Sequence, residues 1–164
     1  MFRLIQVPLD GSSFAEHALP LAVRLAQRDG ADLQVIRVHV PMADAYLYRQ
    51  RPLFANLDRE LMDHAREHLD AIVTSLADDT GLRATPILLK CAVPEMIAHE
   101  QPATAILDTV SSLGADAIAL TTRGQGGLKR LLLGSVADKV LRGSTTPVLI
   151  CPPVTGPVGI EIKE

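Results

Sequence analysis

Hydrophobic residues follow two different patterns along most of the chain. Five short runs are mostly apolar and rich in valine, isoleucine and leucine, which predicts β-strands buried on both faces. These runs span residues 3–9, 32–40, 83–90, 115–122 and 146–153. The segments between them place apolar residues three and four positions apart, the spacing of an amphipathic helix. Helices are therefore expected over residues 13–29, 58–77, 102–113 and 135–142.

Strands and helices alternate strictly in this prediction. Such an order indicates an α/β fold with a parallel sheet covered by helices on both faces. A chain of 164 residues favours a single domain. Ligands of open parallel sheets bind beyond the carboxyl ends of the strands. Two strand ends carry suitable residues, namely 8–12, with the sequence PLDGS, and 121–124, with the sequence TTRG.

Local signals mark the helix boundaries and two irregular segments. Ser13 and Glu16 have the spacing of a capping box, and Pro20 falls early enough that we expect only a kink in the second turn. Residues 41–57 lack periodicity, so a long loop is expected there. Its aromatic residues either pack onto the domain or stack on a base or a partner; they are Tyr46, Tyr48 and Phe54. Residues 91–101 predict a loop with a short helical turn.

Composition narrows the class of protein. Apolar residues make up 48% and charged residues 21%, as expected of a soluble globular protein. A formal net charge of −3 argues against nucleic-acid binding, and no apolar run approaches the roughly 18 residues that span a bilayer. The first apolar run is short and is interrupted by Asp10, unlike a signal peptide. Cys91 and Cys151 form no framework, so we expect reduced thiols and a cytoplasmic location.

A glycine-rich stretch follows the fourth predicted strand. Residues 121–135, TTRGQGGLKRLLLGS, hold four glycines and the basic residues Arg123, Lys129 and Arg130. The stretch matches neither the P-loop nor the G-x-G-x-x-G fingerprint. Gly134 and Ser135 open the next helix, where unpaired N–H groups favour an anion. Two interpretations remain: a phosphate site, or glycines that only make turns and a serine that only caps its helix.

Two segments resemble the universal stress protein family: VPLDGSSFAEHAL, and TTRGQGGLKRLLLGSVADKVLRGSTTPVLI near the end. The resemblance covers residues 2–152. The family motif G-x2-G-x9-G-[ST] reads here Thr121-x2-Gly124-x9-Gly134-Ser135, with threonine in place of the first glycine. The resemblance implies a doubly wound, Rossmann-like sheet of the adenine nucleotide alpha hydrolase-like kind with strand order 3-2-1-4-5. It also implies a family domain over residues 1–153 and a loose tail over 154–164.

The resemblance further implies an adenine nucleotide, ATP or AMP, as ligand. Pro8 and Leu9 would line the base, Asp10 would lie near adenine and ribose, and Val40 would contact adenine. Ribose and phosphates would be held by Thr121, Gly124, Gly134, Ser135 and Val136. From their charge alone, Arg123, Lys129 and Arg130 could attract an anion to the loop, and solvated loop charges are the alternative. Asp10 could orient a ribose hydroxyl or hold Mg²⁺ bound to phosphates; the alternative is an Asx-turn with Gly11.

Evidence for catalysis is weak in the sequence. There is no G-x-S-x-G nucleophile elbow, and no pair of carboxylates accompanies the glycine stretch, so we expect no enzyme beyond a slow ATPase. His64 and His68 are four residues apart on one helix, but a solvated face is favoured over a metal site. His39, at the end of the second strand, is interpreted as a satisfied buried histidine, with a role in lining the site as the alternative.

The last strand, residues 147–151, would be an apolar edge that invites pairing. A two-fold homodimer through this strand would cover it, and the family resemblance implies the same arrangement. The favoured function is a nucleotide-dependent stress sensor or regulator, and the alternative is a nucleotide-independent dimeric interaction module. An ATP-using enzyme of the related pyrophosphatase kind is disfavoured, because DGSS does not match S-G-G-x-D-S.

Overall fold

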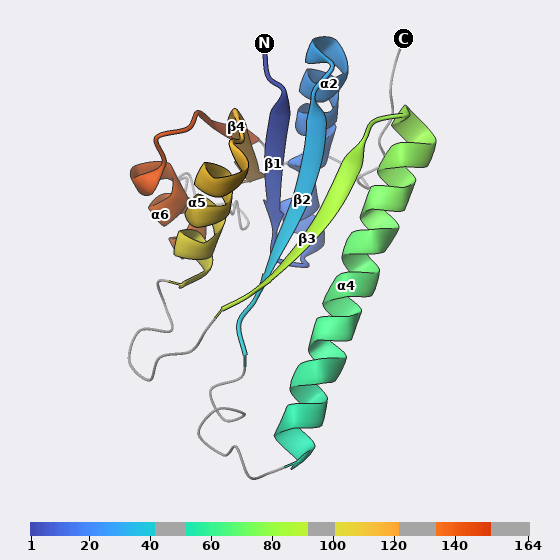
Figure 1. Ribbon diagram of the computed structural model, residues 1–164, viewed down its shortest axis with the longest axis vertical. Helices are drawn as coiled ribbons and strands as arrows, with labels where there is room; N and C mark the ends of the chain where they lie inside the picture. The colour runs from blue at the N-terminus through green and yellow to red at the C-terminus, as the bar shows by residue number, and fades with distance from the viewer. Residues whose placement is uncertain (42–51, 92–100, 122–133, 152–164) are drawn as a thin grey trace, which may run out of the picture.

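A single parallel sheet forms the centre of the molecule (Figure 1). The computed structural model describes residues 1–41, 52–91, 101–121 and 134–151. Its five strands are in the order β3-β2-β1-β4-β5, which confirms the predicted α/β class and strand order. The strands are β1 (Leu4–Leu9), β2 (Asp32–His39), β3 (Ala84–Lys90), β4 (Ala117–Thr121) and β5 (Val148–Cys151). The second and first strands are in register with Pro8 opposite Ile36 and Leu9 opposite Arg37.

Helices cover both faces of the sheet (Figure 1). The helices of the described residues are α1 (Ser13–Glu16), α2 (Leu19–Asp29), α4 (Pro52–Thr80), α5 (Gln101–Leu113) and α6 (Ser135–Gly143). One apolar core lies under α2 and α4, and its largest fully buried side chains include Ile5, Leu33, Leu69 and Leu76. A second core lies on the opposite face under α5 and α6, and it contains Ile106, Ile118, Leu120 and Val140.

The first predicted helix is divided in two, which corrects the expectation of a kink. Helix α1 ends at Glu16, and α2 begins at Leu19 with Pro20 in its first turn, where a missing N–H costs little. The predicted capping box is also wrong: Ser12, one residue earlier, is the N-cap, and its side chain accepts a hydrogen bond from the N–H of Ala15 at 3.2 Å.

Helix α4 is longer than predicted at both ends. It begins at Pro52 instead of residue 58, so the last part of the expected 41–57 loop is helical. Proline favours the first position of a helix because its fixed φ suits that position. The helix continues past residue 77 to Thr80, and Gly81 follows with a φ of +68°, the left-handed conformation that commonly ends helices. Residues 42–51, which include Tyr46 and Tyr48, lie outside the described part of the chain.

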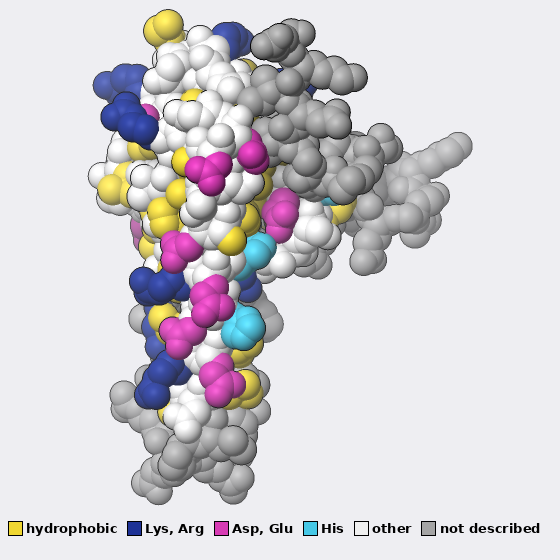
Figure 2. Space-filling model, turned by 90° about the vertical axis from the view of Figure 1, so that its right-hand side faces the viewer, with side chains coloured by type: hydrophobic (Ala, Val, Ile, Leu, Met, Phe, Trp, Pro, Cys, Tyr) yellow, Lys and Arg dark blue, Asp and Glu magenta, His cyan; other side chains and the backbone are white. Residues whose placement is uncertain are grey.

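The outer surface of α4 is charged. Figure 2 shows acidic side chains running along this helix, with basic and histidine side chains beside them. Among the described residues, no helix is both long and apolar enough to span a membrane. His64 is exposed as predicted, whereas His68 is not simply solvated: its Nε2 atom lies 3.1 Å from Oε1 of Glu16 and joins α4 to α1.

Candidate functional site

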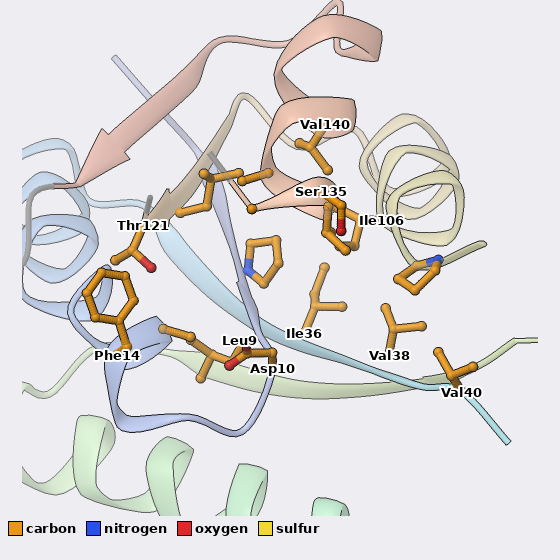
Figure 3. A pocket seen from close by; sticks show the side chains of 17 residues that line it. Leu9, Asp10, Phe14, Ile36, Val38, Val40, Ile106, Thr121, Ser135 and Val140 are labelled. Carbon is orange, nitrogen blue, oxygen red and sulfur yellow. The ribbon is translucent and has the colours of Figure 1, made fainter. Parts of the chain in front are cut away.

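A cavity of about 350 Å³ opens where the strand order reverses (Figure 3). Strand β1 has β2 on one side and β4 on the other, and the cavity lies at their carboxyl ends, as expected at the switch point of a doubly wound sheet. Eight of the ten predicted site residues line this one cavity: Pro8, Leu9, Asp10, Val40, Thr121, Gly134, Ser135 and Val136. The other two, Arg123 and Gly124, lie outside the described residues.

One wall of the cavity is apolar and comes mainly from β2. Ile36, Val38 and Val40 all line it, because side chains two positions apart lie on the same face of a strand. Helix α5 adds Pro102 and Ile106 from the other side. Of these three residues, only Val40 was predicted from the sequence. The two-residue alternation of a strand, followed backward from Val40, also points to Val38 and Ile36. A flat apolar ligand fits such a wall better than a charged one.

The first turn of α6 provides hydrogen-bond donors. Gly134 is the N-cap and makes no side-chain cap, and the first intrahelical bond runs from the N–H of Asp138 to the carbonyl of Gly134 at 2.9 Å. The N–H groups of residues 135–137 therefore precede that bond and have no partner within the helix. Residues 134–137 all line the cavity, and the helix dipole adds positive potential there. Ser135 is the first helical residue, so the interpretation that it only caps the helix is wrong.

The loop after β1 forms an Asx-turn. Oδ1 of Asp10 accepts hydrogen bonds from the N–H of Ser12 at 2.9 Å and from its hydroxyl at 2.5 Å, so the turn is confirmed, with Ser12 as donor. Gly11 has a φ of +85°, and a Cβ atom there would lie 2.6 Å from a guanidinium nitrogen of Arg37. Asp10 is exposed and also lines the cavity, so its role in the turn does not remove it from the site.

Phe14 is a lining residue that the sequence analysis missed. Ser12 starts α1, and this short helix brings Phe14 and Ala15 to the cavity wall. In Figure 3, Phe14 lies beside Thr121, at the end of the cavity away from Val40. No spacing rule marks Phe14 in the sequence, because its position depends on the break between α1 and α2.

His39 lies on the other face of β2 from the cavity wall. Its Nε2 atom is 2.7 Å from Oδ1 of Asp58 on α4, and both side chains are about nine-tenths buried. The interpretation of His39 as a satisfied buried histidine is therefore confirmed, and His39 is not among the residues that line the cavity. Cys91 and Cys151 are buried free thiols, and burial raises the pKa of both.

The fold is that of a doubly wound α/β protein, and its cavity lies at the switch point of the sheet. The model of the universal stress protein family matches residues 1–152, and the chain belongs to this family. A universal stress protein of Thermus aquaticus is 33% identical over 150 residues, covering 92% of this chain and 98% of the relative. The universal stress protein YxiE of Bacillus subtilis is 30% identical over 151 residues, covering 92% and 99%.

Solved structures of the family share the fold. The universal stress protein UspA from Lactobacillus plantarum superposes with a TM-score of 0.69 at 23% identity, over 91% of this chain and 97% of that one. The Archaeoglobus fulgidus protein in complex with dAMP gives a TM-score of 0.61 at 21% identity, over 92% and 97%. A universal stress protein in complex with cAMP gives 0.58 at 20% identity, over 93% and 98%.

Proposed function

We propose that this cavity binds an adenine nucleotide, ATP or AMP, and that the protein acts as a nucleotide-dependent sensor or regulator. The observation that carries the proposal is the first turn of α6, whose N–H groups without helical partners lie at a cavity with a mostly apolar lining. A ligand with one apolar end and one anionic end matches both features. Two solved relatives with bound adenine nucleotides, dAMP and cAMP, support this choice of ligand.

Each part of the nucleotide has a matching part of the cavity. The base would pack against Val38 and Val40, and a phosphate would accept hydrogen bonds from the N–H groups that follow Gly134. Asp10 would lie near the ribose hydroxyls, or near Mg²⁺ if the ion accompanies the phosphates. Thr121 replaces the first glycine of the family motif, and its hydroxyl could donate one more hydrogen bond to the nucleotide.

The lining favours binding over chemistry. Asp10 is the one carboxylate among the described residues of the cavity, and its Oδ1 atom is already engaged by Ser12. General base catalysis of hydrolysis needs a carboxylate or imidazole within hydrogen-bond reach of the attacking water. We therefore propose a slow ATPase at most. Rapid phosphate release that depends on magnesium would contradict this part of the proposal.

We also propose a homodimer that forms through β5. This strand pairs with β4 and ends the described sheet, so its outer edge has no strand beside it there. Ile150 on this strand is 37% exposed, and an exposed apolar edge strand invites pairing with another chain. Light scattering after gel filtration should give twice the chain mass, and Ile150→Lys should shift it to the monomer. A monomeric native protein would refute the dimer. The cytoplasmic location stays a prediction.

Calorimetric titration of the purified chain tests the nucleotide proposal. Adenosine, AMP and ATP, with and without Mg²⁺, separate the contribution of the base from that of the phosphates. We expect AMP to bind at least tenfold more tightly than adenosine, because it alone reaches the donors of α6. A ligand at a hundred times its Kd stabilises a protein by about 2.7 kcal/mol, so thermal unfolding provides an independent check. No heat and no thermal shift at millimolar ligand would favour the nucleotide-independent interaction module instead.

A further inference from the structure

A cluster of ionisable side chains, two buried and one half exposed, lies directly behind the apolar wall of the cavity. It consists of His39 on β2, Asp58 on α4 and Lys90 on β3. Nε2 of His39 is 2.7 Å from Oδ1 of Asp58, and Nζ of Lys90 donates to Oδ2 of the same carboxylate at 3.4 Å. The side chains of His39 and Asp58 are 8% and 11% exposed, whereas that of Lys90 is about half exposed. One carboxylate therefore joins three elements that lie side by side in Figure 1.

The cluster and the cavity share the end of β2. Val38 and Val40 line the cavity, and His39, between them, is directed to the opposite face. His39 and Lys90 are register partners in the sheet, and the carbonyl of His39 also accepts a hydrogen bond from the N–H of Cys91 at 3.0 Å. A rotation of this strand end that moved His39 away from α4 would move both valines.

The carboxylate of Asp58 is ionised and engaged on both oxygens. Burial tends to raise its pKa, but hydrogen bonds and charge from His39 and Lys90 outweigh this effect, so the pKa lies below its ordinary value. Because an ionised carboxylate only accepts, Nε2 of His39 carries the proton in this contact. Removing Asp58 would leave the imidazole of His39 buried without this acceptor, which favours its movement toward water.

We propose that Asp58 is a positioning residue for the base-binding wall. It acts through His39, which holds the end of β2 so that Val38 and Val40 present one fixed surface to the ligand. Lys90 supports the arrangement by occupying the second oxygen of the carboxylate. Asp58 itself does not line the cavity, so its effect on a ligand is indirect. The inference rests on the proposed function for the identity of the ligand.

Asp58→Ala is the direct test, measured with adenosine and AMP on the full chain. We expect both ligands to lose roughly tenfold in affinity and by the same factor, because the two share the base. Asp58→Asn keeps one acceptor oxygen for His39 but not the charge, and it should lose less. An equal loss of affinity for adenosine and AMP distinguishes the Asp58 variants from substitutions at α6, which should lower the affinity for AMP alone.

Asp116→Asn is the matched control. Oδ2 of Asp116 also joins separate elements, since it accepts hydrogen bonds from the N–H groups of Arg3 at 2.7 Å and Leu4 at 3.0 Å. It lies beside the starts of β1 and β4, at the amino-terminal end of the strands, whereas the cavity lies at their carboxyl ends. Loss of this carboxylate should lower stability and leave both nucleotide affinities unchanged.

Hydrogen exchange gives a second readout that needs no ligand. The amide protons of Val38 and Val40 should exchange at least tenfold faster in Asp58→Ala, or in Asp58→Asn if the alanine variant does not fold. They should exchange at the native rate in Asp116→Asn. Native exchange rates in a folded Asp58 variant, or unchanged adenosine and AMP affinities, would overturn the positioning role. A native protein that binds no nucleotide would overturn the proposed function instead, while faster exchange in the Asp58 variants would still support the inferred role of Asp58 in the wall.

Discussion

Replacing Gly134 by aspartate should separate stability from ligand binding. Gly134 is the N-cap of α6 and has a φ of −62° and a ψ of 152°, a conformation that any residue adopts without strain. Aspartate is among the preferred N-cap residues, because its carboxylate accepts hydrogen bonds from the N–H groups of the first turn. In Gly134→Asp the side chain would therefore use the same donors that we assign to the phosphate.

The two effects differ in size as well as in sign. Exchange of an N-cap glycine for aspartate changes stability by only a few tenths of a kcal/mol, in favour of the aspartate. A hydrogen bond to a charged group contributes about 1.5–3 kcal/mol, so the loss of a single phosphate contact lowers AMP affinity by roughly 10- to 150-fold. Repulsion between the new carboxylate and the phosphate adds to this loss. Adenosine, without a phosphate, should bind the variant about as well as the native protein.

The assay is calorimetry with AMP and adenosine, alongside urea unfolding. Gly134→Asn is the matched control, because it is close in size to aspartate and can cap the helix without a charge. It should weaken AMP less than Gly134→Asp does. An equal loss for AMP and adenosine in Gly134→Asp, or unchanged AMP affinity in a protein that binds AMP, would refute the assignment of the phosphate to α6.

Three further predictions concern the turn, the thiols and the acid limit of stability. Gly11→Ala and Gly81→Ala each force a left-handed conformation on alanine, so each should lower the free energy of unfolding in urea by roughly 1–2 kcal/mol. Only Gly11→Ala should also weaken nucleotide binding. Burial raises the pKa of Cys151 from 9.0 to about 11, so at pH 8 its thiolate population is about a hundredfold lower than that of an ordinary cysteine. Alkylation of Cys151, followed by mass spectrometry, should therefore be slow until urea unfolds the chain. A hydrogen bond from Arg28 is the largest cause that lowers the pKa of Asp29 from 3.8 to about 2. A depressed pKa contributes stability above pH 4 that is lost as the pH falls toward 2, so Asp29→Asn should flatten urea stability over that range.

Most of the fold could be predicted because strand burial leaves a strong pattern. Runs such as residues 117–120 are apolar at every position, and the alternation of such runs with helical segments allows few topologies. The site residues at strand ends followed from the same topology, since Asp10 comes directly after one buried strand and Thr121 ends another. Gly134 and Ser135 could be predicted because they match the last two positions of the family motif.

Contacts between distant segments could not be predicted. Asp58 lies in a long charged helix, and nothing in its sequence neighbourhood distinguishes it from the exposed acids around it. Its burial depends on the packing of α4 beside β3, which brings Lys90 and His39 to the same place. Phe14 was missed as well, because it reaches the cavity on the short helix α1, where the sequence predicted one continuous helix over residues 13–29.

The two-residue period of β2 divides the work of the site between two faces. Ile36, Val38 and Val40 form the surface that a ligand would contact, and Arg37 and His39 face the supporting side. On that side Nε2 of His39 lies 2.7 Å from Oδ1 of Asp58, so in our proposal a polar contact fixes the geometry of the wall without entering it. Substitutions at Ile36, Val38 and Val40 should therefore change which ligand is preferred. Substitutions at Arg37 and His39 should instead lower the affinity for all bases by the same factor. The same chain segment could thus change its specificity without losing its support, because neighbouring positions serve different tasks.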